Sequence, residues 1–255
     1  MAKFVRVTLL LIVLLVVAQG AWKARARTTD WNETLRVAVY PINADGGNAT
    51  DAYIAGLRKP VLEPLAAYMR AQAQGYQLAL REPIELYLAP PESALPPVPP
   101  VRGTAPEIAW WSLQMRWWAW RHDGFDGPRP HVRVFVLYHA PAERRVLAHS
   151  IGLRAGMLVI ANAFAGADNE GGNNVVIAHE LLHTFGAGDK YDPASTLPIY
   201  PEGYAEPNAV PLYPQSRAEI MGGRIPLSRN EAEIPRNLEQ TLIGAATARE
   251  INWLK

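Results

Sequence analysis

The sequence predicts one catalytic-size domain of the α/β class, with a mainly parallel, twisted sheet and helices packed on it. The chain has 255 residues, of which 49% are hydrophobic and 19% charged, so it can bury a full core. Segments with strand-like alternation are separated by segments with helical spacing of apolar residues. Their order is strand, helix, strand, helix, strand, which is typical of a parallel sheet.

The amino terminus has the layout of an export signal. Lys3 and Arg6 precede an apolar run from Val7 to Ala18, and small residues follow. The run is shorter than the roughly 20 apolar residues of a spanning helix, which favours a signal peptide. The alternative is an uncleaved membrane anchor, which Trp22 and the basic residues after it would favour. We therefore expect residues 1–27 to be a signal peptide or signal anchor of an exported protein, which is periplasmic, secreted or anchored by this segment.

Periodicity then predicts the first elements of the domain. Residues 35–42, LRVAVYPI, alternate as in a strand, and residues 84–88, IELYL, form a second strand candidate. Between them, apolar residues at three- and four-residue spacing predict a helix from Thr50 or Asp51 to Gly75. Two internal prolines should kink or split this helix.

A proline-rich segment and a tryptophan-rich helix come next. Seven of the 22 prolines fall between Pro90 and Pro106, which predicts a stiff surface loop. Residues 107–121, EIAWWSLQMRWWAWR, predict a helix with tryptophan on more than one face. We favour a helix packed between two layers; the alternative is a helix that contacts a membrane interface or a substrate through its indole rings.

Three further strands and a helix lead to the candidate site. The strands are expected at residues 131–138, 150–154 and 157–162, with one of the last two at the sheet edge. Asn173 or Asn174 is expected to cap a helix that begins near Val175.

This helix contains the sequence His179-Glu180-Leu181-Leu182-His183. Residues four apart lie about 40° from each other around a helix, so His179 and His183 can hold one metal ion. Glu180 is placed to reach a metal-bound water without ligating. Because the chain has no cysteine, any metal site must use His, Asp or Glu. Gly186 can end the helix in the left-handed conformation and turn the chain back, which makes Asp189 a third ligand.

The stretch HELLHTFGAGD, residues 179–189, resembles the metzincin zinc peptidases through the pattern HExxHxxGxxD. Asp189 stands where most members have His, as in the snapalysin-like branch. The segment Glu219-Ile220-Met221-Gly222-Gly223 is similar to the methionine turn of that family. The resemblance implies an α+β zincin-type catalytic domain over residues 28–255. Its upper subdomain would span residues 28–186 and its small, irregular lower subdomain, ending in a helix, residues 187–255, with a cleft between them.

The resemblance also implies a hydrolase, a zinc-dependent endopeptidase. Zinc with three protein ligands keeps an open position and lowers the pKa of a bound water towards roughly 7. Glu180 would take the proton of this zinc-activated water as general base and return it to the leaving amine. A substrate strand would lie along the edge strand at residues 150–154. The implied metal ligands are His179, His183 and Asp189, the catalytic residue is Glu180, and Met221 lies in the structural turn.

Several alternatives stay open at this point. Asp192 is a rival third ligand, and Glu206 or Glu219 would make this a glutamate-liganded enzyme. No tyrosine stands two residues after Met221, so the side chain that stabilises the oxyanion is unassigned among Tyr191, Tyr200, Tyr204 and Tyr213.

Other polar residues are expected to be structural. The remaining histidines are His122, His131, His139 and His149, which we interpret as surface or packing residues. Residues 168–170 are expected to form a turn rather than a calcium site. Two sequences resemble capping boxes, Ser228 with Glu231 and Thr247 with Glu250. A carboxy-terminal helix that packs behind the site is suggested by Leu238, Leu242, Ala245 and Ala246.

Charge and composition limit the partners. With 25 basic and 24 acidic residues the formal charge is +1, so the sequence lacks the excess of positive charge that is typical of nucleic-acid-binding proteins. A peptide or protein substrate is expected, with possible membrane contact through the amino-terminal segment, and the oligomeric state is not predicted. The competing hypothesis is a catalytically idle, exported zinc-binding protein that acts as a partner- or membrane-binding module. The intact Glu180 argues against it, because a structural zinc site needs no base.

Overall fold

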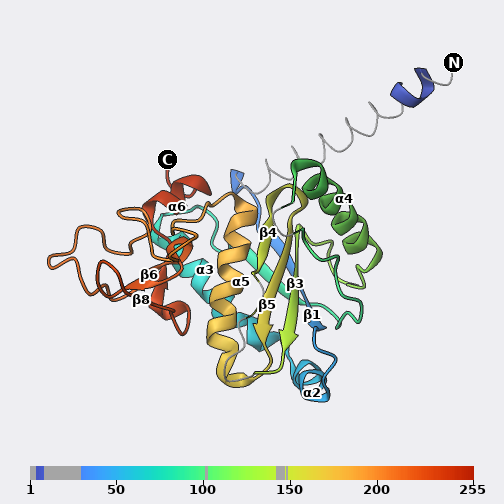
Figure 1. Cartoon of the computed structure of the whole chain (residues 1–255), viewed down its shortest axis with the longest axis horizontal. Helices are drawn as coiled ribbons and strands as arrows, with labels where there is room; N and C mark the ends of the chain where they lie inside the picture. The colour runs from blue at the N-terminus through green and yellow to red at the C-terminus, as the bar shows by residue number, and fades with distance from the viewer. Residues whose placement is uncertain (1–3, 9–29, 101–102, 142–146, 148) are drawn as a thin grey trace.

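The computed structural model describes residues 4–8, 30–100, 103–141, 147 and 149–255. Within these residues the protein is of mixed α/β class, with a mostly parallel central sheet and helices packed against it (Figure 1). Most of the expected export segment, residues 1–27, lies outside the described part. In the part that is described, no helix is both long and apolar enough to span a bilayer.

The central sheet has five strands in the order β2-β1-β3-β5-β4. β1 (Leu35–Asn43), β2 (Ile84–Leu88), β3 (Val132–His139) and β5 (Leu158–Phe164) run parallel, and β4 (Ile151–Leu153) pairs antiparallel with β5 at the edge. The near-continuous apolar runs of β1 and β5 suit strands that are buried on both faces. The predicted parallel sheet and the predicted edge strand are thus confirmed.

The helical segment after β1 is divided as its prolines require. α2 (Asn48–Gly56) is followed by a 3₁₀ turn at Lys59–Leu62 and by α3 (Glu63–Gly75). Proline is tolerated there because Pro60 and Pro64 lie in the first turn of their elements, where the missing N–H needs no partner. The predicted start was wrong: α2 is capped by Gly47, and Thr50 is buried and donates to Asp45.

Helices cover both faces of the sheet. α3 and α5 (Glu170–Phe185) pack on one face, and α4 (Ala105–Arg121) packs on the other. α4 begins at a capping box of Thr104 and Glu107, and it buries Trp111 and Trp118 beside Phe135 of β3. Its other tryptophans are exposed, so our preferred interpretation of a helix between two layers was wrong.

Residues 187–255 are largely irregular, as expected. Their strands form two short pairs, β6 (Ala218–Glu219) with β9 (Thr241–Leu242) and β7 (Ile225–Pro226) with β8 (Ala232–Glu233). Two 3₁₀ turns, at Ile220–Gly222 and Leu238–Gln240, and one α-helix, α6 (Ala245–Glu250), complete this part.

Neither predicted capping box caps a helix. Ser228 and Glu231 close the turn between β7 and β8, where the backbone N–H of Ser228 donates to the carbonyl of Glu231. Thr247 lies inside α6, which begins after Gly244. The expected carboxy-terminal helix was therefore only partly correct, because Leu238 lies in a 3₁₀ turn and Leu242 in β9. The Ser/Thr-x-x-Glu spacing occurs here without the helical backbone that would make it a cap.

Candidate metal centre

α5 carries the candidate metal ligands and is anchored to the end of β5. The side chain of Asn173 donates to the carbonyl of Phe164 and accepts from its backbone N–H. Asn173 therefore lies inside the helix, and the predicted cap before Val175 was wrong, because this asparagine pairs with the sheet instead. Farther along α5, Leu181, Leu182 and Phe185 are fully buried in the main core, which fixes the orientation of the helix.

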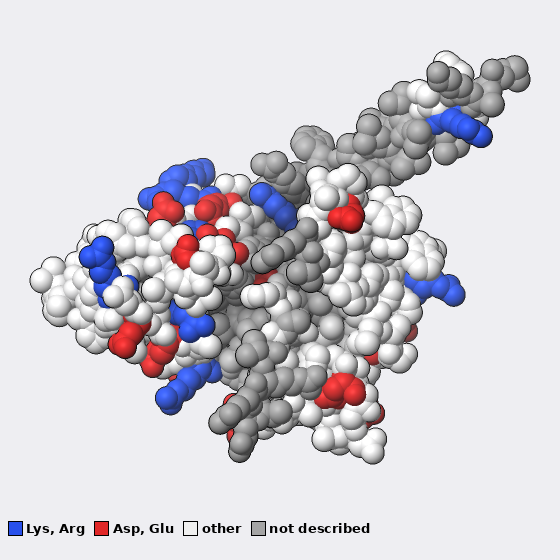
Figure 2. Space-filling model, viewed as in Figure 1, with Lys and Arg blue, Asp and Glu red and all other residues white. Residues whose placement is uncertain are grey.

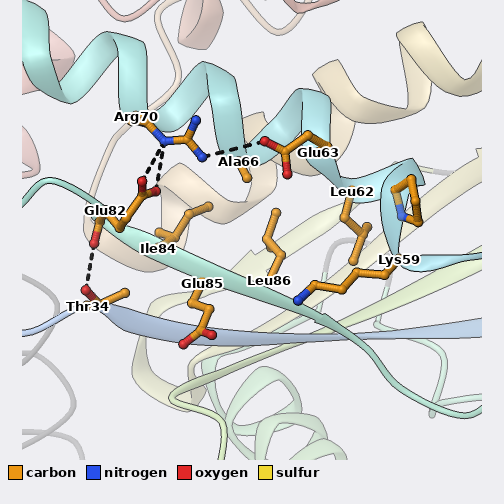
Figure 3. Close-up of a pocket in the computed structure, with 11 residues that line it drawn as sticks. Thr34, Lys59, Leu62, Glu63, Ala66, Arg70, Glu82, Ile84, Glu85 and Leu86 are labelled. Carbon is orange, nitrogen blue, oxygen red and sulfur yellow. Dashed lines mark hydrogen bonds and ion pairs between the residues drawn. The ribbon is translucent and has the colours of Figure 1, made fainter.

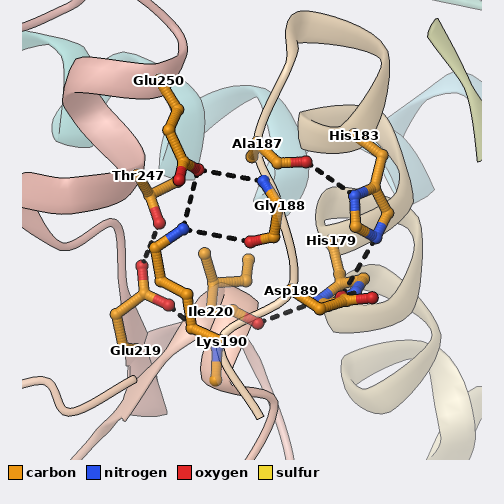
Figure 4. Close-up of polar contacts among 11 residues, drawn as sticks. His179, His183, Ala187, Gly188, Asp189, Lys190, Glu219, Ile220, Thr247 and Glu250 are labelled. Carbon is orange, nitrogen blue, oxygen red and sulfur yellow. Dashed lines mark hydrogen bonds and ion pairs between the residues drawn. The ribbon is translucent and has the colours of Figure 1, made fainter. Parts of the chain in front are cut away.

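His179, Glu180 and His183 form a cluster that could hold a metal ion, and each offers one ligand atom within 4.8 Å of the others. The two imidazole rings lie 4.8 Å apart at 86° to each other. Nδ1 of His179 contacts the carbonyl oxygen of Ile220 at 2.9 Å, and Nδ1 of His183 contacts that of Ala187 at 2.8 Å (Figure 4). Since a carbonyl only accepts, both Nδ1 atoms carry the proton, and both Nε2 atoms are available for a metal.

Asp189 reaches this pair of nitrogens through the turn that ends α5. Gly186 adopts a φ of 115°, and the backbone N–H groups of Gly186 and Ala187 both donate to the carbonyl of Leu182. The chain then returns towards the helix. Oδ1 of Asp189 lies 3.1 Å from Nε2 of His179 and 3.2 Å from Nε2 of His183.

The distances from Asp189 to the two histidines suit a tetrahedral cation. Ligand atoms that lie roughly 2.05 Å from zinc in tetrahedral geometry are about 3.3 Å from one another. The two distances from Asp189 to the histidines, 3.1 and 3.2 Å, are close to this spacing. Two imidazole lone pairs and a carboxylate repel one another at this range unless a proton or a cation lies between them. The donor set of two imidazoles and a carboxylate is one that zinc binds.

The pKa values of Glu180 and Asp189 are shifted in opposite directions by their surroundings. Burial raises the pKa of Glu180, and one of its oxygens, Oε2, is buried without a hydrogen-bond partner. For Asp189, partial burial opposes ionisation, but the adjacent imidazoles of His179 and His183 hold its pKa well below the usual range. Asp189 is thus a stable anion beside the imidazoles, whereas the carboxyl of Glu180 is poised to accept a proton.

The methionine-turn segment lies directly beneath His179. Glu219 is followed by a 3₁₀ turn at Ile220–Gly222, in which Met221 is fully buried. The buried carboxylate of Glu219 accepts from the backbone N–H of Gly222, the backbone N–H of Gly244 and the hydroxyl of Thr247. The turn therefore presents the carbonyl of Ile220 to His179 and is tied to α6 by one acidic side chain.

A second contact ties the Asp189 loop to α6. Lys190 is 4% exposed, and its ammonium donates to Glu250 at 2.7 Å and to the carbonyl of Gly188 at 3.0 Å (Figure 4). The backbone N–H of Lys190 donates to the carbonyl of Met221. Both loops that approach α5 are thus held against the carboxy-terminal helix, which fixes Asp189 relative to the histidines.

The alternative ligands lie elsewhere. Asp192 is in an exposed turn and accepts from the backbone N–H of Ala194 and from Ser195. Glu206 pairs with Arg217, and Glu219 is occupied by the three donors of its turn. The geometry therefore favours Asp189 as the residue that joins the histidines.

One of the four candidate tyrosines lies at the cluster. The ring of Tyr191 is 6.4 Å from that of His179, and burial together with the nearby carboxylates of Asp189 and Glu180 raises the pKa of its hydroxyl. Tyr204 and Tyr213 hydrogen-bond to each other instead, and Tyr200 contacts the carbonyl of Pro207.

Three of the remaining histidines have structural partners. His122 pairs with Glu92, His131 contacts Arg36 and His139 contacts Asn162. Residues 167–169 form a 3₁₀ turn, as expected for a plain turn.

Gly152 of β4 is a site residue that sequence reasoning missed. A Cβ at this position would collide with the carbonyl oxygen of Glu180 and with Cβ of His183. The edge strand can therefore lie against the segment of α5 that carries the candidate metal ligands only because residue 152 has no side chain. A glycine inside a predicted strand is a known sign of close backbone approach, so the signal was present in the sequence.

The opposite edge of the sheet holds a groove of about 720 Å³ between α3 and β2 (Figure 3). The guanidinium of Arg70 is paired within the groove, 2.8 Å from Glu82 and 3.6 Å from Glu63. Since β2 and β4 are the two ends of the sheet order, this groove is separate from the histidine cluster.

No protein-family model matches the chain, and no curated protein matches it.

Proposed function

We propose that this protein is a zinc-dependent endopeptidase of the zincin type. The observation that carries the proposal is the convergence of Nε2 of His179, Nε2 of His183 and Oδ1 of Asp189 beside a buried carboxylate without a full set of partners. Zinc held by these three residues would polarise a substrate carbonyl and acidify a water molecule. The carbonyls of Ile220 and Ala187 orient the two imidazoles for this task.

Glu180 is the proposed general base. It follows His179 directly on α5, and its unpartnered oxygen can accept a proton from an attacking water without first losing a hydrogen bond. Burial raises its pKa, which brings the protonated and ionised forms closer in free energy and suits a group that takes and returns a proton. The proton would then pass from Glu180 to the leaving amine.

β4 is the proposed binding strand for the substrate. It is the antiparallel edge of the sheet, its three residues are half-exposed, and Gly152 brings it against α5 beside Glu180 and His183. An extended peptide could therefore add to this edge and place a scissile bond next to the metal ligands.

Tyr191 is the proposed oxyanion-stabilising side chain. Replacing it with Phe should lower kcat by about 10²-fold, because one hydroxyl donor to the developing negative charge is lost. The amount of zinc bound at saturating zinc should stay the same, since Tyr191 lies beside Asp189 but is not among the three ligands. The matched control is Tyr200→Phe, in which the lost hydroxyl contacts Pro207 instead of the cluster. Steady-state kinetics on a cleaved peptide would measure both; equal rates for Tyr191→Phe and the parent would remove this role.

The test of the proposal is turnover of a diverse peptide library by the full chain loaded with zinc. Mass spectrometry of the products should show internal cleavage that disappears in the metal-free protein and returns when zinc is added. Zinc binding without cleavage of any library member would favour the idle zinc-binding alternative.

A further inference from the structure

α4 has two apolar faces, of which the fold covers one. Trp111, Met115, Trp118 and Ala119 are buried against the sheet. Trp110, Leu113, Trp117 and Trp120 are 64%, 46%, 62% and 72% exposed, and their three- and four-residue spacing places them along the opposite side of the helix. We call these four residues the tryptophan stripe. A surface helix normally presents polar residues to water, so an apolar outer face indicates a binding surface.

The chemistry of the stripe favours a lipid interface. Three of its four side chains are indoles, which concentrate where hydrocarbon meets water because the ring is apolar and its N–H reaches polar groups. The acidic residue of α4, Glu107, is held at the helix start by Thr104, whereas exposed Arg121 ends the helix. The surface over α4 is largely free of charged atoms in Figure 2. A bilayer with anionic headgroups matches this combination of aromatic rings and a terminal cation.

The first part of α4 and the described start of the domain lie at the same end of the molecule (Figure 1). Trp31 packs on Phe185, with 5.2 Å between ring centroids. Gly186, which follows Phe185, lies against the guanidinium of Arg154. Arg154 begins a 3₁₀ turn that ends at Gly156, and this turn contacts α4, because a Cβ at Gly156 would lie 3.5 Å from Nε of Arg116. In Figure 1 the first part of α4 and the carboxy-terminal end of α5 lie at the same, upper end of the molecule.

We propose that the tryptophan stripe docks α4 on the lipid bilayer, with the helix axis parallel to the membrane surface. The apolar run of the predicted export segment ends at Ala18, and the chain from there to Asp30 reaches at most about 40 Å when extended. A retained anchor would thus hold the domain within reach of the bilayer. The stripe follows the convex outer side of a helix, which suits a flat lipid surface better than a peptide, since peptides are bound in grooves or along strand edges.

Because the chain has no cysteine, a single introduced thiol can report the position of the stripe. The full chain would be reconstituted into vesicles of phosphatidylcholine and phosphatidylglycerol, with a nitroxide attached after Trp117→Cys. The matched control is Val210→Cys, since Val210 is 97% exposed in the carboxy-terminal part. Collisions of the nitroxide with lipid-soluble oxygen and with a water-soluble nickel chelate would be measured by electron paramagnetic resonance.

We expect oxygen collisions to exceed nickel collisions several-fold at position 117, and the reverse at position 210. A water-like ratio at both positions would overturn the proposal. Protection of position 117 from both reagents would also overturn it, because this result indicates a protein partner or a second copy on the stripe.

A second variant separates docking by α4 from anchoring by the amino terminus. The nitroxide is attached after Leu113→Cys, with and without the changes Trp110→Ser, Trp117→Ser and Trp120→Ser. All four positions are exposed, so the fold should be retained, which circular dichroism would verify. Loss of the lipid signature at position 113 only when the indoles are absent supports the proposal; a lipid signature without them overturns it.

Discussion

Replacing Glu180 with glutamine is expected to reduce kcat by ~10³-fold or more while zinc remains bound. The amide keeps the size of the carboxyl but cannot accept the proton of the attacking water at neutral pH. Since Glu180 is not one of the three proposed ligands, the stoichiometry of bound zinc should stay the same. Peptide hydrolysis and zinc content of the purified variant would be measured together.

The same variant tests the idle alternative. Glu180 lies in the cluster with both histidines, so in a purely structural site its carboxylate would be the fourth ligand. In that case Glu180→Gln would lose zinc. The matched control is Glu170→Gln on the same helix, whose carboxylate accepts from Tyr53 instead of lying at the cluster. Equal turnover by Glu180→Gln and the parent would refute the proposed mechanism.

Replacing Asp189 with alanine is expected to weaken zinc binding by more than about 100-fold. Loss of a residue that only supports a ligand lowers metal affinity by up to about 100-fold, and loss of a ligand itself should cost more. This change removes the anion that contacts both imidazoles and leaves two neutral donors. Turnover should be lost with the metal. Competition against a chromophoric chelator would measure the affinity.

Asp192→Ala is the control for this change, because Asp192 is the rival ligand by sequence and lies in a solvent-exposed turn. It should bind zinc like the parent. The reverse result, with zinc binding weakened by the change at Asp192 and not at Asp189, would move the third ligand to Asp192.

The strands and the helix divisions were predictable because their causes are local. Alternation over residues 35–42 and 84–88 identifies β1 and β2, and the missing N–H of Pro60 and Pro64 divides the segment between them. Gly186 likewise ends α5 through its own φ of 115°. No distant partner is needed for any of these features, so a short window of sequence contains the information.

Other features depend on partners far away in the chain. Asn173 pairs with Phe164 instead of capping α5, and Thr247 donates to Glu219 instead of capping a helix. In both cases the side chain forms a tertiary hydrogen bond to a distant residue, although its local preference is to cap a helix. Local propensity could not reveal either partner.

The sequence by itself determined the α/β class, the position of HELLH on a helix and the turn that returns Asp189 towards it, because periodicity and glycine conformation are properties of neighbouring residues. Only the tertiary structure decided which aspartate meets the histidines, which tyrosine lies beside them and which face of α4 stays exposed. Those outcomes depend on how α5, the Met221 turn and α6 pack together, through contacts between residues that are distant in sequence. Sequence spacing restricts the candidates, and packing selects among them.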